Sequence, residues 1–405
     1  MMYNEVRNPI ICNDKNYMML FGEHEQIKVT FIEVIGAGGT CIVYKCEREE
    51  NDIKRTCIVK EYYPEFTAPD IHYKRTETGT LCIEADGTLE QQAERIEAEK
   101  KVQKMNIERE YQVNQALFYS DTEKENSPYV YLMDYVKVVG DSTYVILDTT
   151  KGKTLKTVIT HNGNRGIGLE KALLYTRKLL EIIRWMNREK EYVHGDITPQ
   201  NLWVTGENEN ISLKLLDFGS AFKKRTYEMD EEDLILEYAR QILYNEGIGS
   251  STEGFRSIDI MNLWEAKQEF CNMPSNVTRA KKLLECVNIV STEKTDIHAA
   301  LKIFYYLMTG RTYNGIHGIT DIAKFIETDR NDVIVKKLLD LMLNNSKMHY
   351  ETIESAMAEL DSFEDILLGN CTPEVLLQEI KKEIKRQPFN VDKKLFAPIS
   401  YRKDN

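Results

Sequence analysis

Two short stretches, HGDITPQN at residues 194–201 and LDFG at residues 216–219, decide how this sequence is interpreted. They supply Asp196, then Asn201, and then Asp217 sixteen residues after Asn201. An Asp, an Asn and a second Asp in this order suit phosphoryl transfer. One carboxylate orients a nucleophilic hydroxyl, while the amide and the other carboxylate hold Mg²⁺ against nucleotide phosphates. A purely structural role for both stretches together is the weaker interpretation.

Upstream lies a glycine-rich turn, Gly36-Ala37-Gly38-Gly39, between two apolar runs. Small residues allow backbone N–H groups to approach phosphate oxygens closely. Because a strand follows the turn, a dinucleotide-binding turn, which must open a helix, is disfavoured. Taken alone, the turn is equally well explained as an ordinary hairpin loop.

Lys60 ends the apolar run Cys57-Ile58-Val59. An unpaired buried ammonium is costly, so this side chain requires an anionic partner. A nucleotide phosphate or a carboxylate from the long helix that follows would serve. The alternative is a lysine that merely emerges at the end of a strand.

The periodicity predicts an α+β protein, with a sheet followed by a mainly helical part. We expect strands over 28–35, 41–47, 56–62, 129–139 and 143–147, a hairpin over 73–85, and helices over 89–118, 170–188 and from Thr372-Pro373 onward.

Over residues 28–362, the four segments in this order resemble a Hanks-type (eukaryotic-like) Ser/Thr protein kinase. The resemblance implies a two-lobed kinase-like fold, with an antiparallel sheet and one long helix in the first lobe and a mainly helical second lobe. It implies ATP and Mg²⁺ as cofactors. The catalytic residues would be Asp196 as base, Lys60, Glu110 (with Glu108 as the alternative), Asn201 and Asp217, the last two being the metal ligands. The nucleotide would meet Gly36, Ala37, Gly38, Gly39, Val43, Lys60, Leu147, Asp148 and Thr150.

Two later segments extend the resemblance. STEGFRSID at 251–259 resembles the family's substrate-binding element, and TDIH at 295–298, opening a helix that ends in LMTG at 307–310, resembles the helix whose Asp anchors the catalytic loop. Several positions depart from the family. Cys41 replaces the third glycine, Gly195 the usual Arg, and Thr198 the Lys of Ser/Thr kinases, while Asn114 stands at an apolar position. These departures also suggest a bacterial source.

The predicted organisation has four parts with two insertions. They are an N-terminal extension (1–27), a first lobe (28–150, insertion near 64–88), a second lobe (151–365, insertion near 262–291) and a C-terminal helix and tail (366–405).

Three function classes are consistent with these motifs. The first is an active protein kinase, and the second a small-molecule phosphotransferase of the aminoglycoside-kinase type, which Gly195 and Thr198 favour. The third is a nucleotide-binding pseudokinase scaffold. The complete set of catalytic residues and the segments at 251–259 and 295–310 favour the first.

Composition restricts the partners. With 65 acidic and 53 basic residues, the net charge is −12, and nucleic acid is not expected as a partner. The eight cysteines show no metal-binding spacing, and we expect no structural zinc. No segment is long and apolar enough for a membrane span, and residues 1–7 do not resemble a signal peptide. We therefore expect a cytoplasmic enzyme that acts on unidentified protein substrates, with a regulatory partner possible at the long helix.

Overall fold

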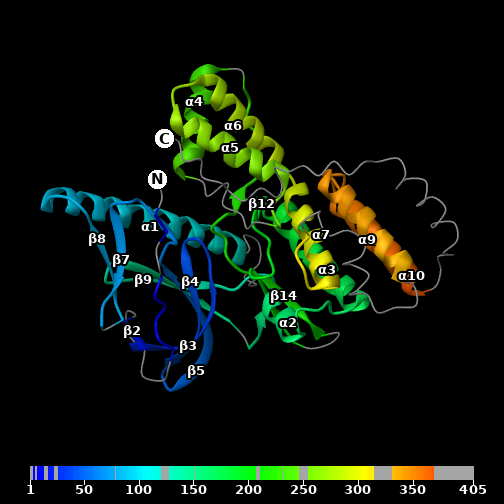
Figure 1. The fold of residues 1–405 in the computed structure, drawn as a ribbon, viewed down its shortest axis with the longest axis horizontal. Coiled ribbons are helices and arrows are strands. Elements are labelled where there is room, and N and C mark those ends of the chain that lie inside the picture. Colours follow the sequence, from blue (N-terminus) through cyan, green and yellow to red (C-terminus); the bar gives the residue numbers. More distant parts are fainter. Residues whose placement is uncertain are drawn as a thin grey trace. The chain divides into compact units, whose positions relative to one another are not determined.

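The computed structural model describes most of the chain (Figure 1), which forms two compact units. Unit 1 comprises 1–153 and 204–219, and unit 2 comprises 154–203 and 220–405. The described residues are 3–4, 7–12, 17–21, 26–77, 79–119, 127–149, 151–206, 210–229, 231–245, 254–313 and 331–368.

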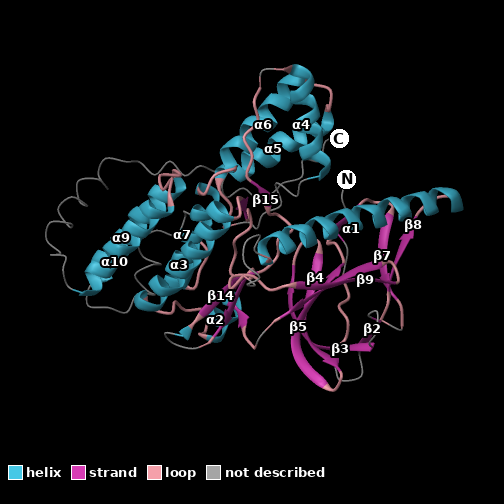
Figure 2. Ribbon diagram, turned by 180° about the vertical axis from the view of Figure 1, so that it is seen from behind, coloured by secondary structure: helices cyan, strands magenta, loops and turns pink. Residues whose placement is uncertain are grey.

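The centre of unit 1 is an antiparallel sheet of six strands, in the order β2-β3-β4-β5-β10-β9 (Figure 2). Along β4, the side chains of Ile42, Tyr44 and Cys46 are buried and alternate with more exposed ones, as the two-residue period of a strand requires. The strands are β2 (Tyr17–Phe21), β3 (Gln26–Ala37), β4 (Cys41–Glu50), β5 (Ile53–Tyr62), β9 (Met133–Val139) and β10 (Ser142–Asp148).

The long helix α1 spans Leu89–Phe118, the range that the sequence predicts. Thr88 begins it with a capping box, in which Thr88 Oγ1 accepts from the backbone of Gln91 and the Gln91 side chain accepts from the backbone of Thr88. Ile107, Val113 and Leu117 form its buried stripe. Three polar side chains, those of Gln103, Glu110 and Asn114, are buried with them.

The predicted insertion at 64–88 folds as a hairpin of β7 (Ile71–Arg75) and β8 (Leu81–Ala85), after β6 (Phe66–Thr67), which pairs with β1 (Tyr3–Asn4). The hairpin contacts α1, the long helix at which a regulatory partner is expected. Tyr73 donates to Glu99 over 2.7 Å, and Gln103 donates to the Tyr73 hydroxyl over 2.8 Å.

A buried ion pair fixes this hairpin to the sheet. Arg75 donates to both carboxylate oxygens of Glu61, over 2.9 and 2.7 Å, and Glu61 is fully buried. The hydroxyls of Tyr44 and Tyr144 donate to the same carboxylate. Burial opposes the charge on Arg75, but the bonds to Glu61 outweigh it and raise the pKa of the guanidinium.

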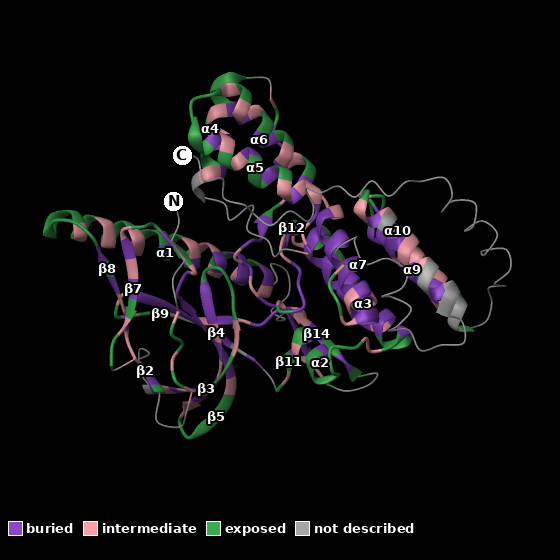
Figure 3. Cartoon of the chain, viewed as in Figure 1, coloured by how far each residue is buried: buried purple, intermediate pink, exposed green. Residues whose placement is uncertain are grey.

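Unit 2 is mainly helical. Figure 3 shows that α7 (Lys294–Thr309) is mostly buried. Of its residues, 14 are buried. Gly310, in a left-handed conformation, ends this helix. The other elements are α2 (Leu155–His161), α3 (Leu169–Arg184), the π-helix η1 (Trp185–Glu189), β12 (Tyr192–Val193), β15 (Phe222–Lys223), α4 (Glu232–Asn245), α5 (Ile258–Asn272), α6 (Val277–Val290), α9 (Asn331–Ser346) and α10 (Ile353–Leu368). The bounds between the units fall within two short strands, β11 (Lys153–Thr154) and β13 (Leu202–Thr205). Strand β14 (Ser212–Leu215) belongs to unit 1.

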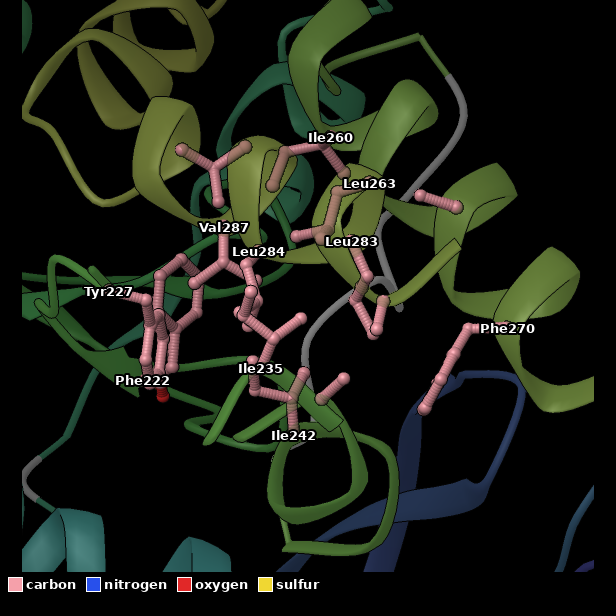
Figure 4. Packing of buried hydrophobic residues seen from close by; sticks show 14 of the residues in the cluster. Phe222, Tyr227, Ile235, Ile242, Ile260, Leu263, Phe270, Leu283, Leu284 and Val287 are labelled. Carbon is pink, nitrogen blue, oxygen red and sulfur yellow. The ribbon is translucent and has the colours of Figure 1, made fainter. Parts of the chain in front are cut away.

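The predicted insertion near 262–291 consists of most of α5 and α6, and these two helices pack with α4 in an apolar cluster that also includes Val193, Phe222 and Tyr227 (Figure 4). Ile235 and Ile242 of α4 face Leu263 of α5 and Leu283 of α6 in this cluster. The segment is therefore a pair of helices whose apolar side chains are buried against other parts of unit 2.

Three expectations differ from the structure. Residues 17–21, assigned to the N-terminal extension, form an edge strand that pairs with β3. The strand expected from residue 129 begins at Met133, after a single bridge between Val130 and Leu215. The helix expected over 170–188 changes at Trp185 into a π-helix. The predicted helix after Thr372 and the residues Ser251, Thr252 and Glu253 lie outside the described residues.

Along the described part of the chain, none of the helices combines the length and apolar character that crossing a membrane would need.

Candidate active site

Lys60, Glu110 and Asp217 meet in unit 1. Strand β5 presents the Lys60 ammonium, which lies 2.6 Å from Glu110 Oε1 on α1 and 2.9 Å from Asp217 Oδ1. Lys60 and Glu110 are both only 5% exposed, whereas 41% of the Asp217 side chain is accessible. The buried ammonium thus has the anionic partners that its position requires. Glu108, the alternative to Glu110, is exposed and lies 3.7 Å from Lys104 on the same helix.

Burial and charge act in opposite directions on this cluster. Burial disfavours the Lys60 ammonium, but the carboxylates of Asp217 and Glu110 outweigh it and raise the pKa of Lys60. Burial raises the pKa of Glu110, and Lys60 opposes that rise. Lys60 is therefore a fixed cation in a low-dielectric site, where its attraction for an added anion is strong.

Asp217 has an unusual backbone conformation. Its φ is +61°, in the left-handed region that residues other than glycine seldom adopt. Its Oδ1 also accepts from the backbone N–H of Gly219, a local bond that Asp favours in turns. Arg109 of α1 donates to the Gly219 carbonyl over 2.7 Å. No sequence pattern indicated Arg109 as a residue of this site.

The glycine-rich turn lies between β3 and β4, with Gly36 opposite Val43 in the ladder. Gly38 N–H donates to the Cys41 carbonyl over 2.9 Å, and Arg7 donates to the Gly38 carbonyl over 2.6 Å. A Cβ at Gly36, Gly38 or Gly39 would meet no atom within 4 Å, and none of these glycines has a positive φ. Neither packing nor backbone conformation within the protein therefore demands glycine here.

Cys41, the departure from the third glycine, is a buried thiol. Burial raises its pKa to about 12, although Lys60 acts in the opposite direction. The thiol is therefore protonated at neutral pH, and this supports the interpretation of Cys41 as an inert small residue.

Asp196 and Asn201 lie together in unit 2. The Asn201 amide nitrogen donates to the Asp196 carbonyl over 2.9 Å and to Asp196 Oδ2 over 3.3 Å. Because the nitrogen is used in this way, Oδ1 is the atom of Asn201 that would bind a cation. In unit 1, Asp217 has a partly accessible carboxylate, so the Asn and the Asp each supply an oxygen of the kind that Mg²⁺ prefers.

Asp296 of α7 holds the backbone that precedes Asp196. Its Oδ2 accepts from the N–H of His194 over 2.9 Å and its Oδ1 from the N–H of Gly195 over 3.0 Å. Asn187 also donates to Oδ2, over 3.2 Å. The buried carboxylate thus has donors on both oxygens, as the resemblance implied for this position.

Gly195 stands where the family usually has Arg, and its conformation gives a physical reason. Its φ is +75°, and an added Cβ would lie 3.1 Å from the Ser220 carbonyl oxygen. A side chain there would be strained, so this backbone conformation favours glycine.

The remaining predicted nucleotide contacts are only partly described. Leu147 is buried in β10, and Asp148 pairs with Cys57 through the backbone of β5. Thr150 lies outside the described residues. Within the described parts of the chain, no cluster of three or more His, Cys, Asp or Glu residues is arranged to hold a metal.

Asn114 clamps α1 to the chain that enters β9. Its amide nitrogen donates to the Tyr131 carbonyl over 2.9 Å, and its Oδ1 accepts from the N–H of Met133 over 2.8 Å. The neighbouring Gln115 donates to the Met133 carbonyl over 3.0 Å. Asn114 is fully buried and lies one helical turn after Glu110, so its two bonds hold the turn of α1 that follows this carboxylate against the chain entering β9.

We expect Asn114→Leu to reduce stability by about 1–3 kcal/mol, because the N–H of Met133 and the carbonyl of Tyr131 lose their buried partners. If Asn114 positions Glu110, kcat should fall more than the affinity for nucleotide changes. Urea unfolding and steady-state kinetics of Asn114→Leu and of Asn114→Asp would measure both. Gln112→Leu, at an exposed position of the same helix, is the matched control. Equal losses in Asn114→Leu and Gln112→Leu would contradict the prediction.

The comparisons with known proteins give a partial match. No protein-family model matches the chain. The serine/threonine-protein kinase atg1 of Dictyostelium discoideum is 34% identical over 95 residues, which are 23% of this chain. The chain spans 14% of the length of that curated relative. This partial likeness suggests a protein kinase and supports, at most, kinase-type phosphotransfer.

Proposed function

We propose that this chain is an ATP-dependent protein serine/threonine kinase that uses Mg²⁺. The observation that carries the proposal is the Lys60 ammonium held between Glu110 and Asp217, at 2.6 and 2.9 Å. A purely structural ion pair needs one carboxylate, whereas Lys60 is held by two, and a lysine that must also bind a phosphate benefits from such a fixed position. The partial likeness to a Ser/Thr kinase supports the same chemistry.

The glycine-rich turn supports a phosphate ligand independently. Three glycines in four residues are not required by internal packing or by backbone conformation. A group from outside the protein that approaches the backbone N–H atoms closely explains them, and nucleotide phosphates are such a group.

Each residue then has a role in the proposed reaction. Lys60 binds nucleotide phosphate oxygens, and Glu110 holds Lys60 in place. Asp196 orients the acceptor hydroxyl and accepts its proton, while Asn201 and Asp217 are the proposed metal ligands. When bound, Mg²⁺ would neutralise charge on the transferred phosphoryl group. Most of the rate enhancement would come from positioning and electrostatics.

Phosphate transfer from labelled ATP to a generic protein acceptor tests the proposal. Wild type should label Ser or Thr residues, and Asp217→Ala and Asp196→Asn should each lose at least about 100-fold of the rate. Asp233→Asn, at an exposed position of α4, is the control and should retain activity. Turnover only with a small hydroxylated acceptor would favour the small-molecule phosphotransferase. If the folded wild type showed no turnover and bound no nucleotide, the proposal would be refuted.

A further inference from the structure

Unit 1 contains a hollow that shares no residue with the candidate active site. It is a hollow of about 650 Å³, lined by parts of β5, β14 and the end of α1 and by the segments around Val130 and Thr149. Its volume is within the roughly 300–1,000 Å³ typical of sites for small ligands. Lys54 on its rim is six residues before Lys60 on β5, which is roughly 20 Å along a strand.

The lining carries an excess of positive charge. Four cationic side chains, those of Lys54, Arg55, Lys151 and Lys214, line this basic hollow, and no Asp or Glu is among the described residues that line it. Among the ion pairs of the described residues, Lys54 is the one of these four with a carboxylate partner, Glu47 at 2.6 Å. In a chain with a net charge of −12, this clustering is not a consequence of composition.

Lys214 is the most enclosed of the four. Its ammonium donates to the Val130 carbonyl over 3.1 Å and lies 4.6 Å from the centre of the Tyr131 ring. These contacts are neutral, and burial lowers the pKa of Lys214. An ammonium has three N–H donors, so the carbonyl leaves others for an anion.

Thr149 adds an unsatisfied hydroxyl to the same hollow. The residue is 9% exposed, and its backbone N–H donates to the Thr56 carbonyl over 3.2 Å. Its Oγ1 is buried and has no hydrogen-bond partner within the described residues. A buried hydroxyl without a partner is unfavourable, and an oxyanion that accepts from it would remove that cost.

We propose that the basic hollow is a binding site for a phosphate-bearing ligand. The phosphate would accept hydrogen bonds from Lys214 and Thr149, while Arg55 and Lys151 neutralise its remaining charge. Arg and Lys are the residues that bind phosphate oxygens in this way. The phosphate could belong to a free phosphate compound or to a phosphorylated side chain, since the contacts made to it would be the same.

Titration of the full chain with inorganic pyrophosphate at low salt tests this site. The backbone amide resonance of Thr149 reports the hollow, and that of Gly38 reports the glycine-rich turn. We expect Thr149 to shift on binding, and Arg55→Ala/Lys151→Ala and Lys214→Met to weaken the affinity measured there at least fivefold. The control, Lys101→Ala/Lys171→Ala, also removes two positive charges, but from exposed helix positions. It should leave the affinity within twofold of wild type.

Three results would overturn the proposal. They are a shift of Gly38 with Thr149 unmoved, an unchanged affinity in Arg55→Ala/Lys151→Ala, and an equal loss in the control pair, which would indicate only general attraction to positive charge. A phosphoserine tripeptide and its unphosphorylated form distinguish the two sources. Binding of the phosphorylated peptide more tightly than pyrophosphate assigns the site to a phosphorylated side chain, and the reverse order to a free phosphate compound.

Discussion

Lys60→Met should lower the rate of phosphoryl transfer by at least about 100-fold and reduce the free energy of unfolding by about 3–5 kcal/mol. Both effects have one cause. The substitution keeps the length of the apolar stem but removes the ammonium that lies 2.6 Å from Glu110 and 2.9 Å from Asp217. Glu110 would then be a buried carboxylate without a cation, and removal of one partner from a buried pair carries the larger part of this cost.

The stability loss in Lys60→Met should depend on pH. Burial already raises the pKa of Glu110, and loss of Lys60 removes the charge that opposes this rise. The folded variant should therefore bind a proton at Glu110 at pH values where the unfolded chain does not. A group with a raised pKa contributes stability below its ordinary value, 4.5 for Glu, and loses that contribution as the pH rises. Lys60→Met should thus be closest to wild type in acid and furthest from it above neutral pH.

Urea unfolding at several pH values, together with the transfer assay, measures both effects. Lys54→Met is the matched control, because Lys54 lies on the same strand and pairs with Glu47 while 57% of its side chain is exposed. It should cost no more than about 1 kcal/mol and show no such pH dependence. If Lys60→Met were no less stable than Lys54→Met, the cluster would not have the energetic role assigned here.

The sequence predicted the elements of unit 1 well because they follow simple periodic patterns. Helix α1 lacks Gly and Pro, and a Thr cap begins it, so its predicted and observed bounds agree. Strand β2 was missed, because it is short and follows a polar segment that gives no alternation to detect. The π-helix at Trp185–Glu189 follows the α-helix without an intervening Gly or Pro, so no breaker marks the change between the two.

For the candidate site, the sequence indicated residue types but not most of their partners. It predicted that Lys60 needs an anionic partner, a phosphate or a carboxylate, and the structure places the carboxylates of Glu110 and Asp217 there. It identified Asn114 only as a departure, whereas the structure shows its amide bonded to the backbone at Tyr131 and Met133. Such contacts join residues far apart in the chain, so helical or strand periodicity does not reveal them. A polar residue within an apolar helical stripe is the one signal that would have found them.

Arg75→Met should also destabilise the protein by about 3–5 kcal/mol, without removing any residue of the candidate active site. Glu61 is fully buried, and Arg75 is its only cationic partner among the ion pairs of the described residues. Without the guanidinium, two tyrosine hydroxyls would remain as donors to a buried charge. Because Glu61 follows Lys60 on β5 and the two side chains point to opposite faces of the strand, strain at Glu61 would reach the candidate site through the backbone.

The neighbour of Arg75 provides the control. Lys74 lies next to it on β7 and pairs with Glu84 over 3.1 Å, but 68% and 57% of these side chains are exposed, so Lys74→Met should cost about 0.5 kcal/mol or less. Arg75→Met/Glu61→Gln, which removes both charges, should recover part of the loss, since the buried carboxylate is then neutral. Urea unfolding of the three variants measures these differences. If the double variant were less stable than Arg75→Met, the unpaired charge on Glu61 would not be the cause of the loss. The loss would then come from the packing of the Arg75 side chain, whose Cζ lies 5.6 Å from the centre of the Tyr63 ring.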